Sequence, residues 1–187
     1  FTFEHMHLDR VPGGSKWEVA PLSLPALKAN LARWQEGLAD RGWNALYWCN
    51  HDQPRVVSRW GDDGAHRVAS AKTLGTTLHL LRGTPYVYQG EELGMTDAVF
   101  TRLAQYRDLE SLNWAAEAMA AGWGEAEVLA SLAARSRDNA RTPMHWDDTE
   151  HAGFTTGTPW LPVTANHREI NAAAALADPD SVFHHYR

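Results

Sequence analysis

The segment from Asn50 to Arg59 carries the most distinctive set of chemically active side chains in this sequence. His51 and Asp52 are adjacent, and Arg55 and Arg59 follow shortly after them. A carboxylate with neighbouring arginines remains ionised at neutral pH, and it accepts charge-assisted hydrogen bonds, for example from the hydroxyl groups of a sugar. An ordinary ion pair within a surface loop is an equally good interpretation of the same residues.

Two other groups of residues fit a metal site or a nucleophile less well. His5 and His7 share one face if their segment is a strand, but no third ligand is spaced to complete a zinc site. Cys49, His51 and Asp52 are contiguous, whereas the members of a thiol catalytic triad normally converge from distant positions. We therefore expect neither a bound metal nor a cofactor.

Regular elements have to position these side chains, and the hydrophobic pattern predicts an alternation of strands and helices. Trp43–Cys49 is a nearly continuous apolar run, which is typical of a parallel strand covered on both faces. Pro85–Gln89 and Phe1–Leu8 are predicted as two further short strands. One amphipathic helix is expected after the N-cap Ser23, and another over Val68–Leu81. This order predicts right-handed βαβ units and a parallel sheet of the α/β class.

The pattern changes after Gly94. Two alanine-rich helices are predicted, near Leu103–Ala121 and Glu125–Ser136, and a long irregular segment follows over Arg137–Pro162. An irregular stretch of this length is usually functional or disordered, and its aromatic and polar content favours function. Because no repeat or linker divides the sequence, residues 1–187 are expected to form part of a single domain.

Composition excludes several classes of protein. The 187 residues carry a net charge of −6, which argues against a nucleic-acid or anionic-membrane surface. No apolar run approaches the roughly 20 residues that cross a bilayer. The single cysteine suits a reducing compartment, so a cytoplasmic location is expected. The sequence begins at Phe1 without Met and ends inside an apparent new element, so we expect a fragment of a longer chain.

Five stretches of the sequence, in order, resemble signature regions of the α-amylase superfamily, glycoside hydrolase family 13, and its oligo-1,6-glucosidase/α-glucosidase branch. The resemblance runs from the first residue to the last, and the order of the five stretches makes it specific. They are Asn50–Gly61 (NHDQPRVVSRWG), Gly83–Met95 (GTPYVYQGEELGM), Tyr106–Asn113 (YRDLESLN), Ser136–Met144 (SRDNARTPM) with Trp146-Asp147, and His151–Thr156 (HAGFTT).

The resemblance implies a partial (β/α)₈ TIM barrel: strands six to eight with their helices and a long βα-loop insertion after strand eight. Asp52 matches the family's third catalytic carboxylate, which steadies the distorted sugar and its developing positive charge. His51 and Arg137 match residues that hold the glucose of the first subsite. Glu110 matches a carboxylate near the second sugar, and Phe3 an aromatic wall at the mouth.

The family's nucleophile Asp and acid/base Glu lie upstream of Phe1, as does the first half of the barrel, and the C-terminal β-domain is also absent. Retaining glycosidases need both carboxylates, about 5 Å apart. Glu91 and Glu92 follow strand eight and are expected to bind backbone amides rather than to replace the missing pair. The 187 residues alone are therefore not expected to hydrolyse a glycoside.

The expected partner is a small α-glucoside oligosaccharide, with either α-1,6 or α-1,4 linkage. The same motifs fit a sucrose isomerase or a trehalose-6-phosphate hydrolase of the superfamily, and Gln53 after Asp52 favours the hydrolases. A non-catalytic barrel homologue that serves as a binding scaffold is the alternative from another class, although a scaffold has no physical need for His51, Asp52 and Arg137. Nothing in the sequence indicates an oligomeric state.

Overall fold

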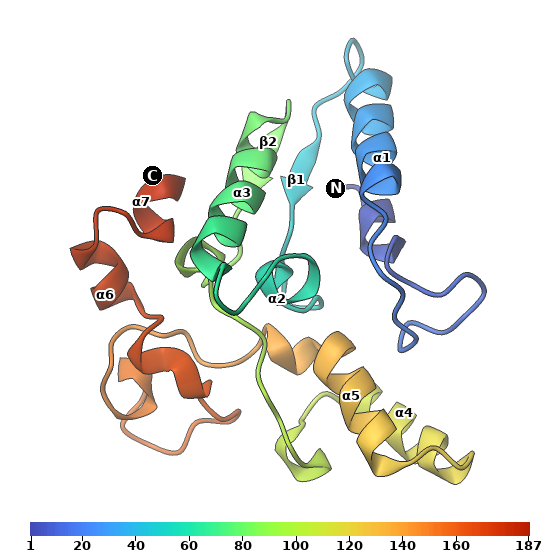
Figure 1. The fold of residues 1–187 in the computed structure, drawn as a ribbon, viewed down its shortest axis with the longest axis vertical. Coiled ribbons are helices and arrows are strands. Elements are labelled where there is room, and N and C mark those ends of the chain that lie inside the picture. Colours follow the sequence, from blue (N-terminus) through green and yellow to red (C-terminus); the bar gives the residue numbers. More distant parts are fainter.

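A computed structural model describes all of residues 1–187 (Figure 1). Its strands are β1 (Ala45–Tyr47) and β2 (Thr84–Tyr86). Its α-helices are α1 (Leu24–Gly37), α2 (Val56–Trp60), α3 (Arg67–Leu80), α4 (Leu109–Ala120), α5 (Glu125–Arg135), α6 (Ala172–Ala177) and α7 (Val182–Tyr186). Short 3₁₀ helices cover Glu4–His7, Glu91–Leu93, Leu103–Gln105, Arg137–Asn139, Glu150–Gly153 and Ala165–Arg168.

The two strands form a parallel pair, as the alternating pattern predicts. Ala45 lies opposite Thr84 and Tyr47 opposite Tyr86, and the connection between the strands contains α2 and α3. Hydrogen-bonded pairing covers three residues in each strand, fewer than the apolar runs of the sequence. The run Leu46–Cys49 is buried nevertheless, so β1 and its continuation lie in the protein core.

The first segment differs from its prediction, because Glu4–His7 forms a 3₁₀ helix instead of a strand. Its amides bond within the segment: the Met6 amide donates to the Phe3 carbonyl at 3.0 Å. The turn buries His5 and Met6 but leaves His7 exposed. The two histidines therefore do not share a face, and a strand-based zinc pair has no geometric basis.

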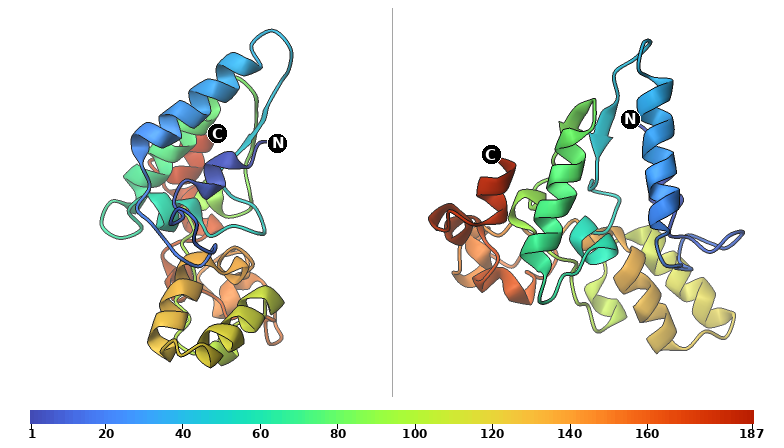
Figure 2. Two further views of the ribbon diagram at one scale, coloured as in Figure 1. Left: turned by 90° about the vertical axis from the view of Figure 1, so that its right-hand side faces the viewer. Right: turned by 45° about the horizontal axis from the view of Figure 1, so that its top comes forward.

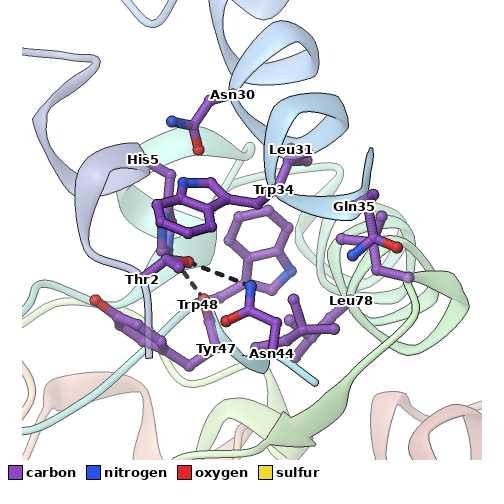
Figure 3. A pocket seen from close by; sticks show the side chains of 12 residues that line it. Thr2, His5, Asn30, Leu31, Trp34, Gln35, Asn44, Tyr47, Trp48 and Leu78 are labelled. Atoms are coloured by element: carbon purple, nitrogen blue, oxygen red, sulfur yellow. Dashed lines mark hydrogen bonds between the residues drawn. The ribbon is translucent and has the colours of Figure 1, made fainter. Parts of the chain in front are cut away.

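Helix α1 packs against β1 through the apolar stripe that the sequence shows. Ser23 caps the helix, since its Oγ accepts the Ala26 amide at 3.3 Å, and Pro25 occupies the first turn, where it loses no helical hydrogen bond. Trp34 and Trp48 line a hollow between α1, β1 and the first 3₁₀ helix (Figure 3). Its volume is only about 10 Å³, about one water molecule, so this region is packed interior rather than a binding site.

The two alanine-rich helices form a hairpin, α4 and α5, beside the loop that precedes α1 (Figures 1 and 2). Helix α4 begins at Leu109 and not at Leu103 as predicted, because Leu103–Gln105 forms a separate 3₁₀ turn and Asp108 caps the α-helix. Val128 and Leu132 are fully buried in its core. Trp17 reaches this core from the loop before α1 and stacks on Trp114 with ring centroids 4.6 Å apart. The hairpin thus packs against the loop before α1 and leads directly into the segment that follows α5.

The expected irregular segment over residues 137–162 contains only short 3₁₀ turns. The chain then forms α6 and α7, and α7 returns to pack on α3. None of the helices has the length and apolar character that a membrane crossing requires.

Candidate active site

Asp52 lies in the loop that directly follows β1. The Asn50 side chain accepts the Asp52 amide at 2.8 Å, which closes a tight turn around His51. Three residues after Asp52, the Arg55 amide donates to the Asp97 carboxylate at 2.6 Å and holds the end of the loop. The loop is therefore anchored on both sides of Asp52, although the Asp52 side chain itself is partly open to solvent.

The Asp52 carboxylate contacts three basic side chains. Arg141 Nη2 lies 2.8 Å from its Oδ1, Arg137 Nη1 lies 3.5 Å from the same oxygen, and His51 Nε2 lies 3.3 Å from Oδ2. Arg141 also donates its Nε to the His51 carbonyl at 2.8 Å. The segment after α5 therefore reaches across to the loop after β1 and partly offsets the negative charge of Asp52.

The arginines expected beside Asp52 have other partners. Arg55 is buried, and its guanidinium donates to the Gln89 and Ala140 carbonyls. Arg59 binds Asp9 through two hydrogen bonds. The expectation that these two arginines flank Asp52 is therefore wrong, because their neighbourhood in sequence does not fix the direction of their side chains.

Glu110 lies next to Arg137 and extends the charged network. Arg137 Nη2 donates to Glu110 Oε2, and Lys16 Nζ lies 2.6 Å from the same oxygen. Partial burial raises the pKa of Glu110, but hydrogen bonds from Lys16 and Arg137 outweigh it and lower the pKa below its usual value. The hydrogen bond to Glu110 in turn raises the pKa of Arg137.

Asp108 lies close to the guanidinium groups of Arg137 and Arg141. Its Oδ1 lies 3.9 Å from Arg137 Nε and 3.7 Å from Arg141 Nη1. The same side chain caps α4 by accepting the Ser111 amide at 3.1 Å. A buried helix cap thus orients the two guanidinium groups that face Asp52.

A hollow of about 180 Å³ lies over this network, and no hydrophobic residue lines it. Five basic and two acidic side chains contribute to its wall. The lining residues are Arg10, Lys16, Asp52, Gln53, Pro54, Arg59, Glu110, Arg135 and Arg137. Such a surface suits a hydroxyl-rich or anionic ligand, since it offers many charged donors and acceptors and little apolar surface.

Of the residues predicted from sequence, the structure brings together His51, Asp52, Glu110 and Arg137. Phe3 lies elsewhere: it packs on Tyr47 with ring centroids 5.5 Å apart and does not line this hollow.

Sequence reasoning missed Lys16, Asp108 and Arg141 as members of the network. Arg141 has a signal in the spacing of the motif Arg137–Arg141, and Asp108 has one as the residue before a helix. Lys16 lies in a loop without any such signal.

Two buried acidic groups lie outside the network. Burial raises the pKa of the Cys49 thiol, and its Sγ accepts the Val56 amide at 3.2 Å, so it is not poised as a nucleophile. Burial also raises the pKa of Glu91 to about 7. Glu91 accepts a hydrogen bond from the Tyr186 hydroxyl at 3.2 Å, and a backbone hydrogen bond at Tyr88 also favours its charged form. No group of three or more His, Cys, Asp or Glu side chains is placed to hold a metal ion.

Known proteins resemble the chain over its whole length. It is 57% identical to the oligo-1,6-glucosidase of Halalkalibacterium halodurans, covering 100% of the chain and 33% of that protein. It is 58% identical to the trehalose-6-phosphate hydrolase of Bacillus subtilis, again over 100% of the chain and 33% of the relative. The crystal structure of the Bacillus licheniformis trehalose-6-phosphate hydrolase superposes with a TM-score of 0.97 at 55% identity, covering 100% of this chain and 34% of that one.

The chain spans about a third of the length of the relatives that it matches. The sequence profile described as "Alpha amylase, catalytic domain" matches residues 1–187, which is every residue of the chain. The fold and the sequence agree on one assignment: the chain belongs to the alpha-amylase catalytic domain family.

Proposed function

We propose that residues 1–187 are the C-terminal part of the (β/α)₈ catalytic domain of a retaining glycoside hydrolase. The protein cleaves α-glucosidic bonds of short oligosaccharides, as an oligo-1,6-glucosidase or α-glucosidase does. In this assignment β1 is barrel strand seven and β2 is strand eight, and residues 1–8 enter from the end of strand six. The support comes from the parallel pairing of β1 and β2 and from the relatives described above.

The observation that carries the proposal is the meeting of Asp52 and Arg137, whose charged groups lie 3.5 Å apart at the rim of an open polar hollow. Asp52 follows the C-terminal end of β1, where the active sites of such barrels lie. An arginine and a carboxylate that line one solvent-open hollow, with a histidine beside the carboxylate, are well suited to hold a sugar ring by its hydroxyl groups.

Each residue of the proposed site has a specific role. Asp52 stabilises the oxocarbenium-like transition state, and His51 and Arg137 hold the hydroxyl groups of the glucose that becomes positively charged. Glu110 binds the second sugar. The nucleophile and the acid/base catalyst are two carboxylates about 5 Å apart, and they are supplied by the part of the protein that precedes this chain.

A hydrolase acting on a phosphorylated disaccharide is the second candidate. The hollow supports it, because Arg10, Lys16 and Arg137 contribute to its wall in addition to the two arginines, Arg59 and Arg135, that bind the buried Asp9. A phosphate group is bound well by several arginine or lysine donors. The similarity to the trehalose-6-phosphate hydrolase of B. subtilis supports the same candidate.

The test is made on the full-length protein with a nitrophenyl α-glucoside as substrate. We expect Asp52→Asn to lower kcat by about 10²–10³-fold, because a charge that stabilises the transition state is lost. Asp148→Asn is the matched control, since Asp148 is an exposed acid outside the network. Unchanged turnover in Asp52→Asn, or a wild-type protein that hydrolyses no glucoside, contradicts the proposed function.

A substrate panel separates the candidates. Isomaltose, maltose, sucrose and trehalose 6-phosphate are compared by kcat/KM and by product analysis. Preference for the phosphorylated sugar, together with a larger rise of KM for it than for isomaltose in Lys16→Gln, favours the second candidate. Formation of an isomer from sucrose identifies an isomerase instead, and binding without turnover identifies a scaffold.

A further inference from the structure

Asp9 lies buried between two arginines that come from distant parts of the chain. Arg59 donates its Nε and Nη2 to the two carboxylate oxygens at 2.7 and 2.8 Å. Arg135 donates its Nη1 to Oδ1 at 3.0 Å and its Nη2 to the Asp9 carbonyl. The Asp9 side chain is 4% exposed and each arginine side chain 5%, so the three charges form one desolvated cluster.

Arg59 links Asp9 to the loop that carries Asp52. Arg59 Nη1 donates to the Gln53 side-chain oxygen at 2.9 Å, and Gln53 is the residue after Asp52. Arg59 Nη2 also donates to the Met6 carbonyl at 2.8 Å. The guanidinium therefore has little freedom, and it presents a fixed donor to the loop after β1.

Arg135 links Asp9 to the segment that carries Arg137. Arg135 is the last residue of α5, and Ser136 follows it, fully buried, with its hydroxyl 2.9 Å from that of Ser111. Arg137 begins the next turn and faces Asp52. The contact between Asp9 and Arg135 thus fixes the point from which Arg137 reaches the site.

The backbone of Asp9 is itself held in place. Its carbonyl accepts the Ala20 amide at 2.9 Å, and Arg10 forms an antiparallel bridge with Val19. Burial raises the pKa of Asp9, but hydrogen bonds and charge from Arg59 outweigh it and lower the pKa to about 2. One carboxylate therefore remains ionised between two buried cations, and its removal leaves those cations uncompensated.

We propose that Asp9 is a positioning residue of this site, which through Arg59 and Gln53 fixes the loop carrying Asp52 and through Arg135 fixes Arg137. The inference rests on the proposed function, because the two side chains that it aligns are those assigned to the sugar. Asp9 does not contact the sugar in this scheme, and its effect is on the geometry of the groups that do.

The test compares four single variants of the full-length protein, and the double variant Asp9→Asn/Gln53→Met, by kcat and KM. Asp9→Asn keeps the shape and removes the charge, and Asp9→Glu keeps the charge. Gln53→Met breaks the link between Arg59 and the loop and leaves the contacts of Asp9 with both arginines in place. Glu4→Gln is the matched control, since it removes an exposed ion pair with Arg33 on the segment just before Asp9.

We expect Asp9→Asn to lower kcat by about 10²-fold with KM changed by less than about threefold, the size expected for a misplacement of about 1 Å. Asp9→Glu retains more activity than Asp9→Asn, and Glu4→Gln equals the wild type. Gln53→Met lowers kcat by a smaller factor, and its effect is not additive with that of Asp9→Asn, because both act on the same link.

Hydrogen exchange supplies a readout that does not depend on activity. In Asp9→Asn the amides of residues 50–55 and 136–141 should exchange faster, while those of the control stay as in the wild type. Unchanged exchange in these two segments overturns the inference, whether or not the wild type hydrolyses glucosides. If Asp9→Asn does not fold, an unchanged kcat in Gln53→Met overturns it instead. A wild type without glucosidase activity rejects the proposed function, and exchange alone then decides the positioning role.

Discussion

Glu91 is a carboxyl group whose ionisation opposes folding. It is buried beneath the Tyr186 hydroxyl and near Cys49, and its second carboxylate oxygen has no hydrogen-bond partner. Burial raises its pKa from the usual 4.5 to about 7. Because the folded state holds this proton more tightly than the unfolded state, stability falls as the pH rises from about 4.5 to about 7.

The corresponding prediction concerns Glu91→Gln. The neutral amide has no charge to desolvate, so the variant should gain stability relative to the wild type as the pH rises from 5 to 8, by up to about 3 kcal/mol. Thermal unfolding at several pH values measures this difference. Glu150→Gln is the control, because the Glu150 side chain is 90% exposed. A stability difference that is independent of pH contradicts the prediction.

At the residue scale, sequence motifs predicted the charged cluster better than they predicted its pairings. His51, Asp52, Glu110 and Arg137 were selected from their motifs, and the structure places them around one network. The expected pairing of Asp52 with Arg55 and Arg59, which follow it in the sequence, was wrong. Arg141 lies 89 residues from Asp52, and its contact depends on where the α4–α5 hairpin docks, which no local pattern contains.

At the element scale, α3 and α7 meet at a glycine. A Cβ added to Gly75 would lie 2.5 Å from a ring carbon of Tyr186, closer than two such atoms can approach. Glycine normally weakens the middle of a helix by about 0.5–1 kcal/mol relative to alanine. Its presence here allows the Tyr186 ring to lie against α3 while the hydroxyl group reaches Glu91.

We therefore expect Gly75→Ala to destabilise the protein by about 1–3 kcal/mol, through overpacking against Tyr186. Gly37→Ala, at the end of α1, is the control, since a Cβ there meets nothing within 4 Å. It should be neutral or slightly stabilising. In a Tyr186→Leu background the penalty of Gly75→Ala should shrink, as measured by chemical denaturation. An equal penalty in both backgrounds shows that the contact is not the cause.

The sequence predicted the principal helices and the parallel strand pair, because their hydrophobic periodicity reflects burial directly. It failed at the first segment, where the alternation of Phe1, Phe3, His5 and His7 resembles a strand. A strand requires a partner for its amides, and this segment satisfies them by local turns while the His5 ring bonds the Tyr47 carbonyl at 3.1 Å. Pairing is a property of the surrounding sheet and is absent from the local pattern.

At the scale of the whole molecule, the sheet is open. It has two strands, so each has an edge without a strand partner, and Phe1 and Tyr86 expose 64% and 50% of their surface beside it. Their rings lie 4.8 Å apart and form an exposed aromatic face with Phe3, which packs on the buried ring of Tyr47. A (β/α)₈ barrel has eight strands and leaves no such edge, so this face is the place where the remaining strands of the proposed barrel would pack.

The last prediction follows from this open face. Residues 1–187 produced alone should show no turnover of a nitrophenyl α-glucoside, and co-production with the remaining parts of the proposed full-length protein should restore it. Tyr86→Asp should prevent this reconstitution by placing a charge in the aromatic face, without changing the helical circular dichroism of the isolated chain. Met119→Asp is the control, because Met119 is exposed on α4, away from the sheet. Turnover by the isolated chain, or reconstitution that tolerates Tyr86→Asp as well as Met119→Asp, contradicts the proposed completion of the barrel.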